Sequence, residues 1–458
     1  MLFKMKGFLG SLKGDRQFFN KLFVLALPIM IQNFIVSSLN MVDTLMIGKV
    51  GEDEIAALGI ANQLFFMFNL IIIGVTAGCC MFISQYWGSG DKRRIKNVSA
   101  IGLTLIFVTG AIFTLAALVF PSPILGLFTD DLRVVSLGVD YVKIVSLSYI
   151  MTGISFFLAG ALRSIGSARL PMVVSAIAVL INAGLNYIFI FGNFGAPKMG
   201  VKGAALGTLI ARICEIILIF ILAFKKGSVL KGGFKEYFGF DKAFAKKIMA
   251  SAFPVILNEA LWGLGMTFYT AAYGQIGKEA IAVMQICNTV LNLMMVACFS
   301  IANAAMVMVG HEIGGGDIPK AKVYAERYAV ISFILGLLMG ASILIFSNPI
   351  LSLFNVSENV KNAAVTIFII FAVVSPVRAM NNSCITGIFR GGGDAKFALA
   401  VELVSMWIIG VPLAFLGAAV WGLTIEQVVI LTTAEEVFKV IMCLIRFKRG
   451  KWIHDLTK

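Results

Sequence analysis

Charged residues and histidine are scarce in this chain. Asp, Glu, Lys and Arg make up 14% of its 458 residues, whereas soluble domains contain roughly 25%. The two histidines are too few for a histidine-rich metal site, and the seven cysteines form no C-x-x-C pair. No G-x-x-x-x-G-K-S/T loop occurs, which excludes ATP binding by that route. No group of residues suggests catalysis, so we predict that the protein is not an enzyme and needs no cofactor.

Long apolar runs dominate instead. Hydrophobic residues make up 59% of the chain, and its mean hydropathy is +0.94. Runs of about 20 residues match a helix that crosses a hydrocarbon layer of ~30 Å. We therefore predict an all-α membrane protein with twelve transmembrane helices. The predicted spans are 22–47, 55–87, 97–120, 134–162, 170–191, 203–224, 248–274, 279–311, 325–346, 360–389, 397–417 and 424–446.

The formal net charge of +14 lies mostly between these runs. With both termini inside, 28 Lys and Arg fall in inside segments and six in outside loops. Positive charge concentrates on the cytoplasmic side of membrane proteins. The pattern predicts a multi-pass protein of the plasma (inner) membrane with cytoplasmic termini. It argues against nucleic acid as a partner and names the lipid bilayer as the setting.

The two halves of the chain repeat each other. A shift of 226 residues aligns glycine and proline positions of the two halves, and one inserted residue extends the match. Such residues are required by backbone geometry at turns and kinks, so their agreement favours duplication over chance. The matched pairs include Pro28 with Pro254, Gly48 with Gly274, Gly90 with Gly316 and Arg163 with Arg390.

The duplication predicts two six-helix lobes related by an axis along the membrane normal. The lobes are expected at 1–224 and 248–458, the second with a short basic tail, and 225–247 is expected to be a cytoplasmic linker. Two such lobes around a shared interface suit alternating access. We therefore predict a secondary transporter driven by an ion gradient.

Polar residues inside the spans mark the candidate transport path, because each is costly against lipid. Asp43 is the acid beside a polar stripe of the first span, and burial disfavours its charged form. We predict ion coupling at Asp43, Asn40, Asn182 and Asn186, with no metal beyond a Na+ near Asp43. The predicted substrate cavity comprises Asn33, Ser37, Thr44, Asn62, Asn69, Glu259, Gln285, Asn288 and Asn292.

Other charges inside the spans are expected to be structural. Arg212 with Glu215, and Glu436 with Lys439, are spaced as i, i+3 pairs on a helix. Glu402 follows shortly after a basic loop and could lie near the cytoplasmic end. The repeat aligns Asp43 with Tyr269 and Asn33 with Glu259, so the two lobes are expected to bind the coupling ion unequally.

Six short segments carry a family resemblance. They are LPIM at 27–30, MVDTLMIG at 41–48, AALG at 56–59, GSGD at 88–91, RGGGD at 390–394 and GVPLA at 410–414. In this order, the segments resemble the multidrug and toxic compound extrusion (MATE) family of cation-coupled antiporters.

The resemblance implies extrusion of organic, mainly cationic, drug-like compounds in exchange for H+ or Na+ by a monomer. It also implies a coupling role for Asp43, while Asn186 stands where one branch has a second acid. A lipid-linked sugar flippase of the same superfamily and a channel remain as alternatives. Flippases favour cationic cavities, and only four bases lie inside the spans: Lys143, Arg212, Arg378 and Lys439. Saturable, uphill flux would separate an antiporter from a channel.

The charge count predicts a topology. Cysteines introduced at Gly51, Ala196 and Asn355 should react with membrane-impermeant reagents from outside intact cells. A cysteine at Gly232 should react only after the membrane is opened, because the basic linker is expected inside. Labelling of position 232 in intact cells would overturn this orientation.

Overall fold

The computed structural model describes residues 15–352 and 356–458. The side chains of Leu39, Asn40, Met41, Thr44 and Leu45 also lie outside the described part. Within the described residues every regular element is a helix. The all-α prediction is therefore confirmed.

The first half of the chain forms six long helical segments, one of them composed of α6, η1 and α7, and three short helices, α5, η2 and α10. Its elements are α2 (Arg16–Gly48), α3 (Glu52–Ser89), α4 (Lys92–Val119), α5 (Pro121–Leu125), α6 (Leu132–Val145), η1 (Ser146–Ser148), α7 (Tyr149–Ser164), α8 (Arg169–Phe191), η2 (Asn193–Gly195), α9 (Val201–Ala223) and α10 (Phe234–Phe238). The short α10 lies in the predicted linker.

The second half repeats this order with more irregular helices. Its elements are α11 (Lys242–Ile276), α12 (Lys278–Gly314), α13 (Ile318–Leu351), α14 (Glu358–Asn382), η3 (Ser383–Phe389), α15 (Ala395–Glu402), η4 (Leu403–Gly410), α16 (Val411–Phe415), η5 (Leu416–Val420) and α17 (Ile425–Arg449). The segments η3, η4 and η5 are π-helices, each of which widens a helical turn. The first of them ends just before Arg390, near where the repeat needs its one inserted residue.

Eleven helical segments of the described chain are long and apolar enough to cross a membrane. The twelfth predicted span is α17, whose 25 residues include Glu435, Glu436 and Lys439. At about 1.5 Å per residue, α17 is long enough to cross, and its charges have partners described below. The predicted twelve-helix architecture is confirmed.

Repeated Gly-Asp turns end and restart the helices. Gly90 and Gly316 adopt left-handed φ values of 79° and 83°. The aspartate after each caps the next helix: Asp91 Oδ1 accepts from the backbone N–H of Arg94 at 2.9 Å, and Asp317 Oδ1 from that of Lys320 at 3.1 Å. Glycine tolerates the left-handed turn and aspartate satisfies free N–H groups. The duplicated motif is therefore a duplicated helix boundary.

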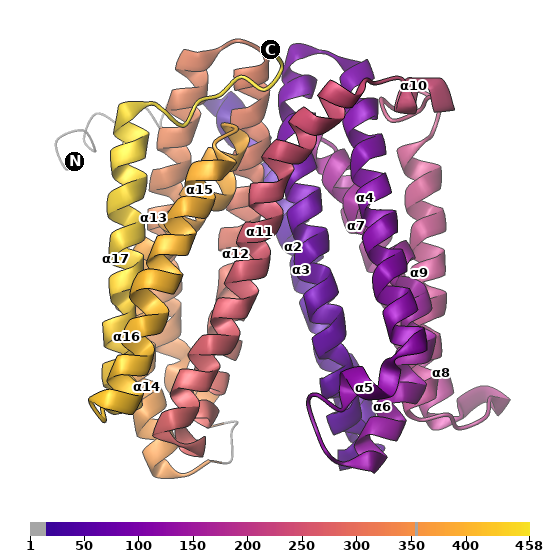
Figure 1. The fold of residues 1–458 in the computed structure, drawn as a ribbon, viewed down its shortest axis with the longest axis vertical. Helices are drawn as coiled ribbons and strands as arrows, with labels where there is room; N and C mark the ends of the chain where they lie inside the picture. Colours follow the sequence, from indigo (N-terminus) through magenta and orange to yellow (C-terminus); the bar gives the residue numbers. More distant parts are fainter. Residues whose placement is uncertain (1–14, 353–355) are drawn as a thin grey trace.

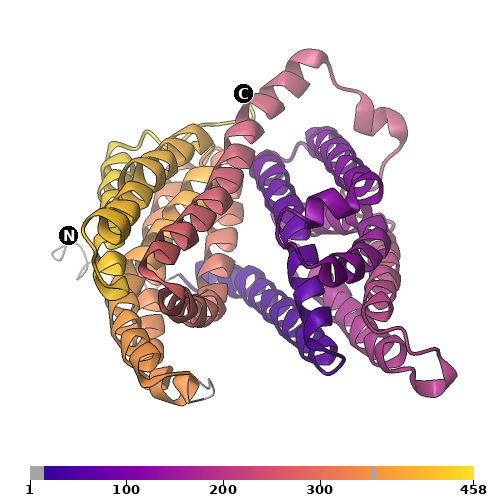
Figure 2. The same ribbon diagram turned by 60° about the horizontal axis from the view of Figure 1, so that its bottom comes forward.

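The two halves lie side by side, pack together from one end to the middle of α3 and α11, and diverge toward the other end (Figures 1 and 2). We call the end at which they pack, which holds the C-terminus, the α3–α4 turn and the α12–α13 turn, the basic end, and the other the opposite end. The start of α2 crosses to the second half, where Phe18 is fully buried among Tyr324 and Tyr328. The halves are therefore interlocked at the basic end.

Glycines allow the backbones of α3 and α12 to pack directly against each other at the basic end. A methyl group at Gly88 would overlap the carbonyl oxygen of His311, and one at Gly314 would overlap that of Gln85. The Gln85 amide also donates to the carbonyls of Gly391 at 3.0 Å and His454 at 3.1 Å. Small residues of this kind allow close helix approach inside membranes.

Gly88→Ala should lower the temperature of thermal unfolding of the purified protein in detergent. The added methyl group forces two helix backbones apart, an overpacking cost of about 1–3 kcal/mol. Gly59→Ala on the same helix is the matched control, because nothing lies within 4 Å of the added atom. Equal unfolding temperatures for the two variants would contradict the close contact.

Candidate functional site

Asp43 lies where α2 meets α8. Asn186 Nδ2 donates to Asp43 Oδ1 at 2.8 Å. Asn182, one turn earlier on α8, satisfies both ends of its amide when its nitrogen faces Asp43 Oδ1 at 3.2 Å and its oxygen faces Thr208. Both asparagines are almost fully buried, with 0% and 3% of their surface exposed. The structure thus places both amides beside the acid.

The α9 helix closes this site. Gly207 leaves room for Asn186, because a methyl group there would overlap Asn186 Oδ1. Arg212, a base on the same helix, pairs with Glu215 at 2.5 Å, as predicted from their spacing. Among the described residues, none forms an ion pair with Asp43, so its carboxylate has neutral hydrogen-bond partners only. Such a carboxylate can accept a proton or attract a cation.

The rest of the predicted stripe on α2 is partly accounted for. The side chains of Asn40 and Thr44 lie outside the described residues. Ser37 is exposed, and Asn33 Nδ2 donates to Ser300 Oγ of α12 at 3.4 Å, which links the two halves.

Five further amides were predicted to line a cavity. Asn62, Gln285 and Asn292 are exposed, whereas Asn69 and Asn288 are half-buried. None of their side chains contacts the Asp43 site through a hydrogen bond in the described part of the chain, and their role stays a prediction.

Glu259 is held by an arginine. Arg390 Nη2 donates to Glu259 Oε1 at 2.7 Å and to Asn258 Oδ1 at 2.8 Å. In the first half, Arg163 Nη1 donates to Gln32 Oε1 at 3.1 Å. Because the repeat aligns Gln32 with Asn258 as well as Arg163 with Arg390, the two halves share one contact.

Arg163 and Arg390, both counted among the inside residues, lie at the ends of helical segments. Arg163 is in the last turn of α7 and Arg390 directly follows η3, and polar partners on α2 and α11 hold their guanidinium groups. Their inside location stays a prediction; without them the count would be 26 inside against six outside, so the asymmetry does not depend on them.

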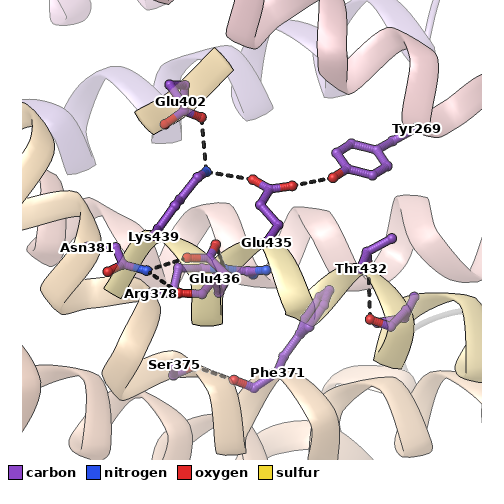
Figure 3. Close-up of polar contacts among 11 residues, drawn as sticks. Tyr269, Phe371, Ser375, Arg378, Asn381, Glu402, Thr432, Glu435, Glu436 and Lys439 are labelled. Atoms are coloured by element: carbon purple, nitrogen blue, oxygen red, sulfur yellow. Dashed lines mark hydrogen bonds and ion pairs between the residues drawn. The ribbon is translucent and has the colours of Figure 1, made fainter. Parts of the chain in front are cut away.

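A network of buried charges lies in the second half (Figure 3). We call its five charged side chains, Arg378, Glu402, Glu435, Glu436 and Lys439, the Lys439 cluster. Lys439 Nζ contacts Glu402 Oε1 at 3.0 Å and Glu435 Oε1 at 2.5 Å. Arg378 Nε donates to Glu436 Oε1 at 3.1 Å and Asn381 Nδ2 to Glu436 Oε2 at 2.8 Å. The Tyr269 hydroxyl donates to Glu435.

The predicted pair of Glu436 with Lys439 is wrong. Glu436 faces Arg378 on α14, while Lys439 reaches Glu435 one turn away and Glu402 on α15. Helical spacing could not reveal these partners, because two of the three lie on other helices. Glu402 is 8% exposed and belongs to this cluster, which the sequence did not predict.

The two halves of the chain both match one protein family. A family model described as MatE matches residues 28–188 and 254–416, which together exceed half of the chain. The chain belongs to the MatE family. The two matched segments correspond to the two repeats, each of which begins at the proline in its first helix.

This MatE protein has relatives along nearly its whole length. The probable multidrug resistance protein NorM of Thermotoga maritima is 24% identical over 440 residues, which cover 94% of this chain and 92% of that protein. The uncharacterized transporter YisQ of Bacillus subtilis is 26% identical over 435 residues, 94% of each chain.

Solved structures share the fold. A multidrug resistance MATE family transporter described in an outward-facing conformation superposes with a TM-score of 0.83 at 20% identity, covering 94% of this chain and 96% of that one. A Pyrococcus furiosus transporter of the MOP superfamily, described as having a binding pocket of reverse polarity, gives the same values. These similarities show a shared fold.

Arg390→Met should destabilise the protein by about 3–5 kcal/mol, because it leaves the Glu259 carboxylate buried without its base. Adding Glu259→Gln should recover much of that loss, since the unpaired charge is then removed. Chemical unfolding of the single and double variants in detergent measures both effects. A double variant no more stable than Arg390→Met would show that the ion pair does not set the cost.

Proposed function

We propose that this MatE transporter exports organic, mainly cationic, compounds in exchange for H+ or Na+ by alternating access. The observation that carries the proposal is Asp43, a carboxylate inside a membrane-spanning helix whose described partners are amides rather than bases. An acid in that position costs free energy, so its presence there points to a function. The relatives named as multidrug resistance proteins support drug-like substrates.

One charge links the two ligands in this mechanism. A proton or Na+ arriving from outside neutralises Asp43 and weakens its attraction for a cationic compound, which then leaves. Loss of the ion inside restores the charge and the affinity. Because the effects of ion and compound on each other's binding are reciprocal, each must weaken the other by the same factor.

Alternating access requires two parts of the protein to move relative to each other. We propose that 1–224 and 248–458 move as lobes, that 225–247 links them, and that the basic end faces the cytoplasm of a plasma-membrane monomer. The halves meet at the basic end through Gly88 and Gly314. An inward-open state then requires those close contacts to separate.

Asp43→Asn should abolish export driven by an ion gradient while leaving the protein folded, because it keeps the shape of the side chain and removes its charge. The measurement is efflux of ethidium, a cationic dye, from proteoliposomes under an imposed H+ or Na+ gradient. Coupling between two sites is typically worth about 5–150-fold, so in Asp43→Asn the gradient should no longer accelerate efflux by a factor of that size.

Two variants frame this experiment. Asp53→Asn is the control, because the Asp53 side chain is 40% exposed and its partner Arg133 is exposed as well. Glu259→Gln is the competitor in the second half. If Asp43→Asn exports ethidium at the wild-type rate while Glu259→Gln does not, the second half carries the coupling.

A further inference from the structure

The Lys439 cluster touches the residue that replaces Asp43 in the second half. The repeat of 226 residues aligns Asp43 with Tyr269, and the Tyr269 hydroxyl donates to Glu435 of the cluster (Figure 3). An acid in the first helix of one half thus corresponds to a phenol in the first helix of the other. The carboxylate at this second position is supplied by α17.

Both positions are built against a glycine. A methyl group at Gly207 would overlap Asn186 of the Asp43 site, and one at Gly410 would overlap the Tyr269 hydroxyl and crowd Glu435. In each half a glycine of a neighbouring segment makes room for the polar groups. The second half has therefore kept a polar site at this position with different residues.

The charges of the Lys439 cluster do not balance. Among the residues that the structure describes, Glu402, Glu435 and Glu436 pair with two bases, Lys439 and Arg378. The three carboxylate side chains are 10–12% exposed and Lys439 is 8% exposed. An excess negative charge enclosed to this degree is costly unless a proton or cation neutralises it.

The hydrogen-bond donors around each carboxylate indicate which of the three would take up a proton. Glu436 accepts from Arg378 and Asn381, and Glu435 accepts from Lys439 and Tyr269. Among the described residues, Glu402 accepts from Lys439 alone, and it shares this donor with Glu435. Lys439 Nζ lies 3.0 Å from Glu402 Oε1 and 2.5 Å from Glu435 Oε1, so Glu402 has the weaker contact.

One carboxylate oxygen of the cluster, Oε2 of Glu402, accepts no hydrogen bond in the described part of the chain. The cluster is therefore short of one positive charge, and Glu402 is its carboxylate with the fewest donors. One added proton would supply both a charge and an O–H donor.

We propose that Glu402 is a second coupling residue, which binds one proton as its carboxylate becomes a carboxylic acid. This inference rests on the proposed antiport. With Glu402 protonated, two carboxylates face two bases and Lys439 remains with Glu435. Without the proton, Lys439 is shared between Glu402 and Glu435, so the ion pairs report the protonation state to α15 and α17.

A proton suits this site better than a metal ion. The Lys439 ammonium already lies between Glu402 and Glu435, where a metal cation would meet a like charge. A proton instead binds to a carboxylate oxygen directly and removes its negative charge.

The surroundings of Glu402 name the groups that can affect its protonation. They are Lys439, Glu435, Glu436 and Cys443 on α17, Arg378 on α14, Tyr269 on α11 and Cys384 on η3. Only Lys439 contacts Glu402 directly in the described residues. Glu402→Gln leaves two acids and two bases in the cluster, so this variant should fold.

Infrared difference spectroscopy of the full-length protein in liposomes, recorded between acidic and alkaline pH, tests the inference. Wild type should show a carboxylic-acid band that titrates, and Glu402→Gln should lose it. The band should persist, shifted, in Glu402→Asp, which keeps a carboxyl group. Asp43→Asn and Glu358→Gln, whose side chain is 79% exposed, should retain the Glu402 band unchanged. Ethidium transport driven by a pH gradient should fall about tenfold in Glu402→Gln.

The two readouts separate this inference from the proposed function. A band that survives in Glu402→Gln, or ethidium transport at the wild-type rate in that variant, overturns the coupling role of Glu402. If wild type fails to transport ethidium under any gradient, the antiport proposal fails. Loss of the band in Glu402→Gln would then still establish its proton.

Discussion

The low polarity of the membrane interior is the constraint on which the rest of this structure depends. Every charge placed there needs a partner or a neutralising ligand, because water is absent. Most charges follow this rule through pairs such as Arg212 with Glu215 and Arg390 with Glu259. Asp43 departs from it as an acid of the first half whose described partners are neutral amides. The exceptions, rather than the pairs, point to function.

Duplication supplied one scaffold twice, and the two copies have kept their mechanical parts while changing their polar sites. The Gly-Asp turns and the arginine contacts to the first helix of each half recur. The acid does not: Asp43 corresponds to Tyr269, and the carboxylate that Tyr269 contacts comes from α17. A transporter with unlike sites in its two halves can couple them to different steps of one cycle.

The sequence predicted the helices well because their signals are local. Apolar runs locate all twelve spans, and the contact of Asp43 with Asn186 agrees with the coupling site predicted from polar faces and family resemblance. The Lys439 cluster was missed because its partners are distant: Glu402 and Lys439 are 37 residues apart. Helical spacing suggested Glu436 for Lys439, but Arg378 on another helix takes that carboxylate. Local rules cannot rank such competing partners.

The segment after α17 has a mechanical consequence. Trp452 is buried in the second half, while Leu456 packs in the core of the first half and donates its N–H to Gln85 at 2.7 Å. Lys247 holds the carbonyl of Leu456 at 2.9 Å. The segment from Trp452 to Leu456 therefore connects the two halves. Any hinge motion at the basic end must either extend this segment or break the contacts of Trp452 or Leu456. The strength of these contacts would then contribute to the barrier between conformations, far from either charged site.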